Sequence, residues 1–140
     1  MIQVYLLCIA YLLLGTAFLL SDTYGLTFPL LLSLRYAFRT HASLRRILIL
    51  AGLLITLALA FFPMDPGPWL LGDLVPMLNV FSLTLWFLYQ ALRGIGVKQE
   101  EQQTVLDATG LYMERNKRNV GFFTMGIAII HFIAPQLVLL

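Results

Sequence analysis

Charged, thiol and imidazole side chains are scarce in this 140-residue chain, which has seven acidic residues, nine basic residues, two histidines and one cysteine. Cys8, His41 and His131 share no metal-ligand spacing. The chain also has neither a glycine-rich phosphate loop nor a serine nucleophile elbow. We therefore expect no metal, no cofactor and no catalytic residue. The few basic residues flank apolar segments, where membrane orientation explains them, so the sequence predicts no nucleic-acid binding.

Apolar residues are abundant instead. They make up 60% of the chain and charged residues 11%, whereas soluble domains are about 45 to 50% apolar and about 25% charged. A soluble domain of this size could not bury so much apolar surface, because roughly a third of its unfolded-chain surface stays exposed. The composition predicts an all-α, polytopic integral membrane helical bundle that forms a single domain over residues 1–140.

Four apolar segments are long enough to be strong transmembrane helices. An α-helix rises ~1.5 Å per residue and the hydrocarbon core of a bilayer is about 30 Å thick, so about 20 apolar residues span it. The four segments are residues 2–20, 47–62, 74–92 and 120–139.

Residues 24–44 leave two interpretations open. The preferred one is a short fifth span in which Arg35 reaches back to the headgroups. The alternative is an amphipathic interfacial helix, because Arg35, Arg39 and Arg46 fall on one stripe and apolar residues spread over the opposite side. The amino terminus is cytoplasmic with the short span and outside with the interfacial helix.

The basic residues indicate sidedness under both interpretations. They fall in two regions separated by one pass out and one pass back: Arg35, Arg39, Arg45, Arg46 in the first, and Arg93, Lys98, Arg115, Lys117, Arg118 in the second. The positive-inside rule makes both regions cytoplasmic. This predicts a plasma (inner) membrane protein with a cytoplasmic connector at residues 93–119, while residues 63–73 and the carboxyl terminus lie outside.

The connector contains a helix-forming stretch with an apolar side. Val105, Ala108, Leu111 and Tyr112 recur at helical spacing. This side is predicted to contact the membrane or a partner if the connector is more than a solvated link.

The outer turn at residues 63–73 is rich in proline and glycine. Asp65 lies in a stiff Asp-Pro-Gly-Pro turn, and Asp73 is placed to cap the next helix. Turn formation and capping account for both aspartates. The alternative is that Asp65, Trp69 and Asp73 form an outward-facing binding site.

Two polar residues and one small-residue pattern stand inside predicted spans. Asn79 is interpreted as an interhelical hydrogen-bonding residue or part of a cleft, and His131 as a buried structural histidine or a relay or ligand residue. Gly52, Thr56 and Ala60 recur every four residues, a pattern that lets helices approach closely within a chain or between chains.

The function that best fits this sequence is a small non-catalytic subunit or assembly factor of a larger membrane complex. Its expected partners are membrane lipids and either other membrane subunits or further copies of itself. The alternative is a small oligomeric transporter, channel or lipid-handling protein whose pathway uses Asp73, Asn79 and His131. A membrane enzyme ranks third.

Overall fold

The computed structural model describes residues 2–61, 73–94 and 105–133, and these residues form helices and no strands. The predicted all-α fold is therefore confirmed. The six described helices are α1 (Ile2–Tyr24), α2 (Pro29–Thr40), α3 (Ala42–Phe61), α4 (Leu74–Gly94), α5 (Val105–Arg115) and α6 (Lys117–Ile133).

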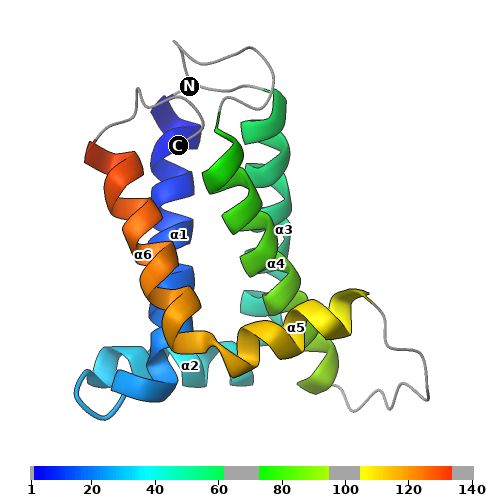
Figure 1. Ribbon diagram of the computed structural model, residues 1–140. Helices are drawn as coiled ribbons and strands as arrows, with labels where there is room; N and C mark the ends of the chain where they lie inside the picture. Colours follow the sequence, from blue (N-terminus) through cyan, green and yellow to red (C-terminus); the bar gives the residue numbers. More distant parts are fainter. Residues whose placement is uncertain (1, 62–72, 95–104, 134–140) are drawn as a thin grey trace.

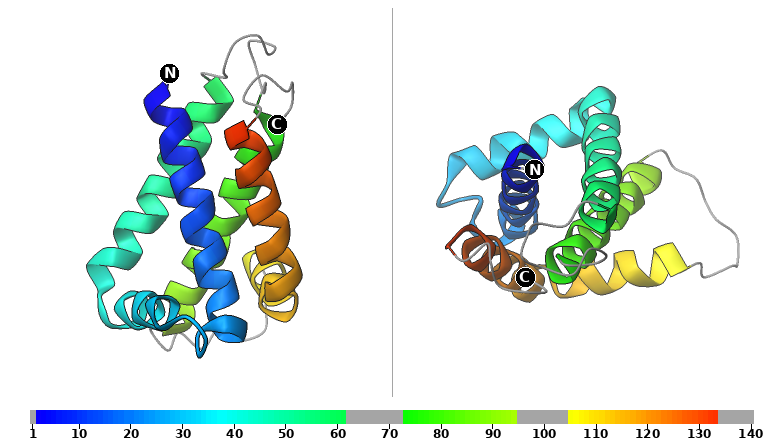
Figure 2. Two further views of the ribbon diagram at one scale, coloured as in Figure 1. Left: turned by 90° about the vertical axis from the view of Figure 1, so that its left-hand side faces the viewer. Right: turned by 90° about the horizontal axis from the view of Figure 1, so that it is seen from above.

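Four of the helices, α1, α3, α4 and α6, run along a common axis and form a bundle, while α2 and α5 lie across one of its ends (Figure 1). Packing is most extensive between α1 and α6 and between α3 and α4. Seen along the bundle axis, α2 and α5 lie on opposite sides of the bundle (Figure 2).

One end of the bundle carries the positive charge. Every basic residue that the structure describes lies on α2, on α5 or at a helix terminus beside them: Arg35, Arg39, Arg45, Arg46, Arg93, Arg115, Lys117 and Arg118. We call this end the basic end. The gathering agrees with the two basic regions of the sequence lying on one side of the bundle.

Three of the described helices are long and apolar enough to cross a membrane: α1 from Gln3, α3, and α4 to Arg93. The prediction of four strong spans is thus corrected to three. The described part of α6 has 17 residues, or about 26 Å at ~1.5 Å per residue. It opens with Lys117, Arg118 and Asn119, so its apolar part is shorter still. Residues 134–139 of the predicted fourth span lie outside the described residues.

The preferred short fifth span near residues 24–44 is wrong, because α2 is too short to cross, while the placement of the alternative amphipathic helix at a membrane interface stays a prediction. With 12 residues, α2 is only about 18 Å long, and it lies across the bundle end (Figure 1). It begins at Pro29, whose preceding residue Phe28 is extended, as a residue before proline prefers to be. It ends where His41 returns to extended backbone.

A close helix–helix contact is centred on Gly52. A Cβ atom at Gly52 would collide with Thr84 and Tyr11. The Tyr11 hydroxyl lies 3.1 Å from the Leu48 carbonyl oxygen, to which it donates, and 3.1 Å from Thr84 Oγ1. Glycine is therefore what lets α3 approach α1 and α4 here. In the predicted small-residue stripe, Gly52 is buried within the chain, and Thr56 and Ala60 are half-buried.

Candidate functional site

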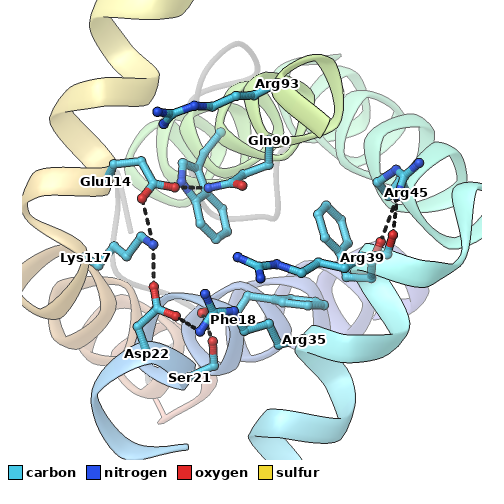
Figure 3. Close-up of a pocket in the computed structure, with 12 residues that line it drawn as sticks. Phe18, Ser21, Asp22, Arg35, Arg39, Arg45, Gln90, Arg93, Glu114 and Lys117 are labelled. Carbon is cyan, nitrogen blue, oxygen red and sulfur yellow. Dashed lines mark hydrogen bonds and ion pairs between the residues drawn. The ribbon is translucent and has the colours of Figure 1, made fainter. Parts of the chain in front are cut away.

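A pocket of about 610 Å³ opens at the basic end of the bundle (Figure 3). Side chains from all six helices line it: Phe18, Ser21, Asp22, Arg35, Phe38, Arg39, Arg45, Trp86, Gln90, Arg93, Glu114 and Lys117. We call it the basic-end pocket. It is the strongest candidate site because polar and apolar groups converge there from distant parts of the sequence.

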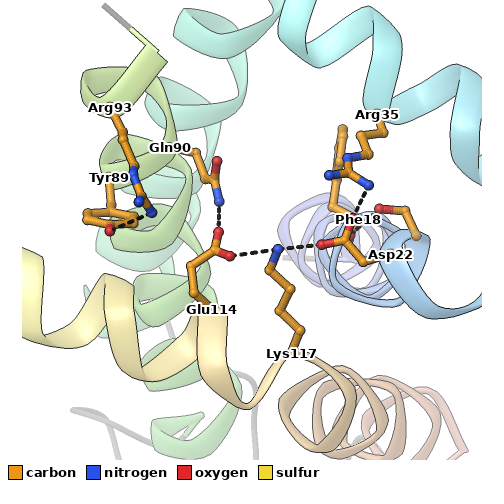
Figure 4. Close-up of polar contacts among 9 residues, drawn as sticks. Phe18, Asp22, Arg35, Tyr89, Gln90, Arg93, Glu114 and Lys117 are labelled. Carbon is orange, nitrogen blue, oxygen red and sulfur yellow. Dashed lines mark hydrogen bonds and ion pairs between the residues drawn. The ribbon is translucent and has the colours of Figure 1, made fainter. Parts of the chain in front are cut away.

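A chain of ionic and polar contacts borders the pocket (Figure 4). The Asp22 carboxylate pairs with both Arg35 and Lys117. Lys117 Nζ also lies 2.7 Å from Glu114 Oε2, and the Gln90 amide donates to the other oxygen of Glu114. We call these five residues the ion chain. It ties α1, α2, α4, α5 and α6 together at the basic end.

The ion chain is predicted to hold α2 against α1. An Asp22→Asn variant removes the charge at the centre of the chain, and we expect about 1 kcal/mol less resistance to local opening of α2, because the paired side chains are partly exposed. Hydrogen exchange of the α2 amides measures this opening. High salt should loosen α2 in the wild-type protein and have little effect in the variant. Equal salt dependence in the two proteins would contradict the role given to Asp22.

Three arginines line the pocket outside the ion chain. Arg39 points into the pocket (Figure 3), and its side chain makes no hydrogen bond or ion pair with any described residue. Arg45 Nη1 donates to the carbonyl oxygens of Arg39 at 2.7 Å and Phe38 at 3.3 Å, which caps the end of α2. Arg93 Nη1 lies 3.2 Å from the Tyr89 hydroxyl, with its guanidinium over the same ring. None of these three charges is neutralised by a described carboxylate.

Aromatic side chains form the inner wall of the pocket. Phe18, Phe38 and Trp86 line it, and all three pack on Phe87, with ring centroids 5.2 to 5.3 Å apart. Phe87 itself is fully buried. The wall therefore joins the charged pocket directly to the apolar core.

These features suit the binding of an anionic group. Arginines near an aromatic wall can hold an anionic group through charge-assisted hydrogen bonds while an apolar extension lies on the rings. In the part of the chain that the structure describes, no group of three or more histidine, cysteine, aspartate or glutamate side chains is placed to hold a metal ion.

The predicted outer-loop residues lie away from this pocket. Asp65 and Trp69 fall outside the described residues. Asp73 is buried directly before α4, and its carbonyl oxygen accepts a hydrogen bond of 3.0 Å from the Met77 amide. Asp73 therefore begins the helix, while the predicted three-residue outer site stays a prediction.

The predicted intramembrane residues lie inside the bundle. Asn79 is buried and its Oδ1 accepts a 3.2 Å hydrogen bond from Thr124 Oγ1, which links α4 to α6. His131 is fully buried, with its ring 4.9 Å from that of Tyr5 on α1. Neither residue, nor Asp73, lines the basic-end pocket.

The basic-end pocket was not predicted from the sequence. The positive-inside rule accounts for the arginines as orientation signals, and no sequence pattern singles out Gln90. The sequence holds one weak indication of the site. Asp22 is the charged residue that follows the first apolar segment, and the other charged residues that line the pocket also lie near the ends of apolar segments. No pattern in the sequence pairs Asp22 with Lys117, which lies 95 positions away.

The described residues form a small all-α bundle with three helices that could cross a membrane and a charged pocket at one end. A protein-family model matches residues 1–131, so the chain belongs to that family, whose function is uncharacterised. No curated protein and no solved structure matches the chain.

Proposed function

We propose that the protein is a non-catalytic integral membrane protein that binds the anionic headgroup of a lipid-like molecule in the basic-end pocket. The observation that carries this proposal is the combination of Arg39, Arg45 and Arg93, uncompensated by any described carboxylate, with an aromatic inner wall in one pocket. This makes lipid handling, the alternative from the sequence, the leading function.

The proposed membrane placement puts the pocket at the level of the headgroups. With α1, α3 and α4 spanning the bilayer, the basic end lies at a membrane surface, and the positive-inside rule assigns that surface to the cytoplasm. Because α2 is too short to cross, this placement puts the start of α1 outside. Anionic lipids are found in the cytoplasmic leaflet, so the pocket has suitable ligands beside it.

The orientation of α2 supports the same placement. Its apolar residues Leu30 and Tyr36 are 80% and 71% exposed, whereas Arg35 and Phe38 line the pocket. A helix with apolar groups outward and a charged inner side suits lipid around it and a polar chamber behind it. Arg35 and Arg39, which share one stripe in the amphipathic arrangement expected from the sequence, both line the pocket.

Lipid selectivity of the purified protein tests this function. Protein in nanodiscs of mixed phosphatidylcholine and anionic lipid is transferred to a mass spectrometer, and the retained lipids are identified. We expect anionic lipid to be enriched on the wild-type protein. Arg39→Ala should weaken that retention roughly tenfold, because a hydrogen bond to a charged group contributes ~1.5 to 3 kcal/mol.

The matched control is Arg46→Ala. Arg46 is exposed at the same end of the bundle and does not line the pocket. The Arg46→Ala substitution removes the same charge from the molecule and leaves the lining of the pocket unchanged. If both variants lose anionic lipid equally, the retention reflects general surface charge, and the pocket function is refuted.

An accessory subunit of a larger membrane complex stays the second candidate, and α5 is the observation that favours it. The apolar side predicted for this segment is exposed, including Val105, Leu111 and Tyr112. The helix packs on α4 with the other side, where Gly110 lies against the Tyr89 ring. Mild detergent extraction followed by mass spectrometry decides this candidate, since recovery of the chain without any co-purifying membrane subunit excludes a fixed complex.

A further inference from the structure

Trp86 is a buried aromatic residue beside the basic-end pocket. Its side chain is 5% exposed and lines the basic-end pocket. The indole Nε1–H has no acceptor among the described residues. Buried donors are nearly always paired, since leaving one unsatisfied costs free energy. The nitrogen atom is itself buried, so Trp86 contributes the face of its ring to the pocket wall.

The charge of the pocket indicates a ligand with more than one negative charge. Five basic and two acidic side chains line it, which leaves an excess of three positive charges. The ion chain commits Arg35 and Lys117 to the two carboxylates. Arg39, Arg45 and Arg93 therefore line the pocket without a described carboxylate partner.

We propose that the headgroup bound in the pocket is a lipid phosphate monoester, held by Arg39 together with Arg45 and Arg93. This inference rests on the proposed function and names its ligand class. A phosphate monoester carries about −1.5 to −2 charges at neutral pH and three terminal acceptor oxygens. A phosphodiester headgroup has a single negative charge, so it matches the excess positive charge and the open donors less well.

The surroundings of the pocket favour a lipid over a soluble phosphate. The wall formed by Phe18, Phe38 and Trp86 offers apolar contact to the first part of an acyl chain. The pocket volume of about 610 Å³ exceeds what inorganic phosphate occupies, and lies within the ~300 to 1,000 Å³ of small-molecule sites. Phosphatidate is the simplest membrane lipid that has both a phosphate monoester and acyl chains.

Trp86 fluorescence tests the ligand class. The chain has two tryptophans, so Trp69→Phe leaves Trp86 as the only indole. This variant is placed in phosphatidylcholine nanodiscs containing either phosphatidate or phosphatidylglycerol at equal total negative charge. We expect phosphatidate to change the Trp86 emission at a mole fraction roughly tenfold lower than phosphatidylglycerol does, since it offers more charge-assisted hydrogen bonds.

The outcomes separate this inference from the proposed function. Equal responses to the two anionic lipids overturn the phosphate-monoester assignment but leave anionic binding intact. No response to either lipid beyond pure phosphatidylcholine overturns both. A third outcome concerns nanodiscs without phosphatidate. If glycerol 3-phosphate or inorganic phosphate saturates the change in Trp86 emission there, at concentrations comparable to that of the lipid, the ligand is not a lipid.

Three variants test the assignment to the arginines. In the Trp69→Phe background, Arg39→Ala should abolish the preference for phosphatidate, and Arg46→Ala should keep it. Trp86→Phe keeps an aromatic ring in the pocket wall, and we expect it to retain as much phosphatidate as the wild-type protein by mass spectrometry. If Trp86→Phe does not fold, the comparison of Arg39→Ala with Arg46→Ala still tests the proposal. An unchanged preference for phosphatidate in Arg39→Ala overturns it.

Discussion

Replacing Phe87 with alanine should lower the free energy of unfolding by about 3 kcal/mol, at the lower end of the cost of deleting a buried aromatic ring. Phe87 is fully buried on α4, and the rings of Tyr11, Phe18, Phe38 and Trp86 lie 5.2 to 6.1 Å from it, centroid to centroid. In a lipid-embedded bundle the loss is mainly one of packing contacts, since lipid is as apolar as the core. Reversible unfolding in mixed detergent, followed by circular dichroism, measures it.

The matched control is Phe123→Ala. Phe123 lies on α6 and is 64% exposed, so its ring has no comparable set of neighbours. We expect its replacement to change the free energy of unfolding by no more than about 0.5 kcal/mol. Similar losses in the two variants would contradict the central position assigned to Phe87. Phe87→Ala should also weaken anionic lipid retention, because the inner wall of the basic-end pocket rests on this ring.

The second large effect is expected at Gly52, where leucine has no room. Tyr11 and Thr84 occupy the space that a Cβ atom needs, and both are buried. Leucine forces α3 away from α1 and α4 and breaks the Tyr11 hydrogen bond to the Leu48 carbonyl oxygen. We expect Gly52→Leu to lower the free energy of unfolding by about 3 kcal/mol, the upper part of the usual range for overpacking.

Gly126→Leu provides the control for this substitution. A Cβ atom at Gly126 on α6 meets nothing within 4 Å, so the added side chain extends into open space. We expect the bundle to keep or slightly gain stability, since glycine in a helix interior costs roughly 0.5 to 1 kcal/mol relative to alanine. Comparable losses from the two leucine substitutions would mean that Gly52 does not mark a close helix contact.

Helix positions followed from the sequence more closely than helix ends did. The apolar segment predicted at residues 47–62 corresponds to α3, which begins five residues earlier at Ala42 and includes Arg45 and Arg46. An apolar run reports where lipid is preferred, whereas a helix continues as long as its backbone hydrogen bonds are made. The helix therefore extends into the charged boundary that hydropathy treats as its end.

The nature of α2 could not be decided from its residues. Nine consecutive residues from Leu26 to Leu34 contain only apolar side chains, threonine, serine and a proline, which is compatible with a short span. The position of α2 across the bundle end decides between a span and a short helix. There Arg35 forms an ion pair with Asp22 on α1. That ion pair depends on tertiary contact, so neither the periodicity nor the apolar content of residues 24–44 predicts it.

Local pairing rules do not give the partner of Glu114 on α5. In a continuous helix, Glu114 and Arg118 would be placed to form an ion pair, because they are four residues apart. In the structure Glu114 instead contacts Lys117 and Gln90. A break between α5 and α6 at Asn116 turns Arg118 onto a different helix. The break between α5 and α6 therefore determines which basic residue contacts Glu114.

Composition, apolar run length and charge placement determined that this chain is all-α, that it holds helices of membrane length, and that its basic residues gather at one end. These are properties of single segments, because helix formation and preference for lipid depend on nearby residues. The tertiary structure alone decided that Asp22 meets Lys117 across 95 positions and that Arg39 and Trp86 line one pocket. A pocket requires side chains from separate helices to converge, and helix packing, which brings them together, leaves no periodic mark in the sequence.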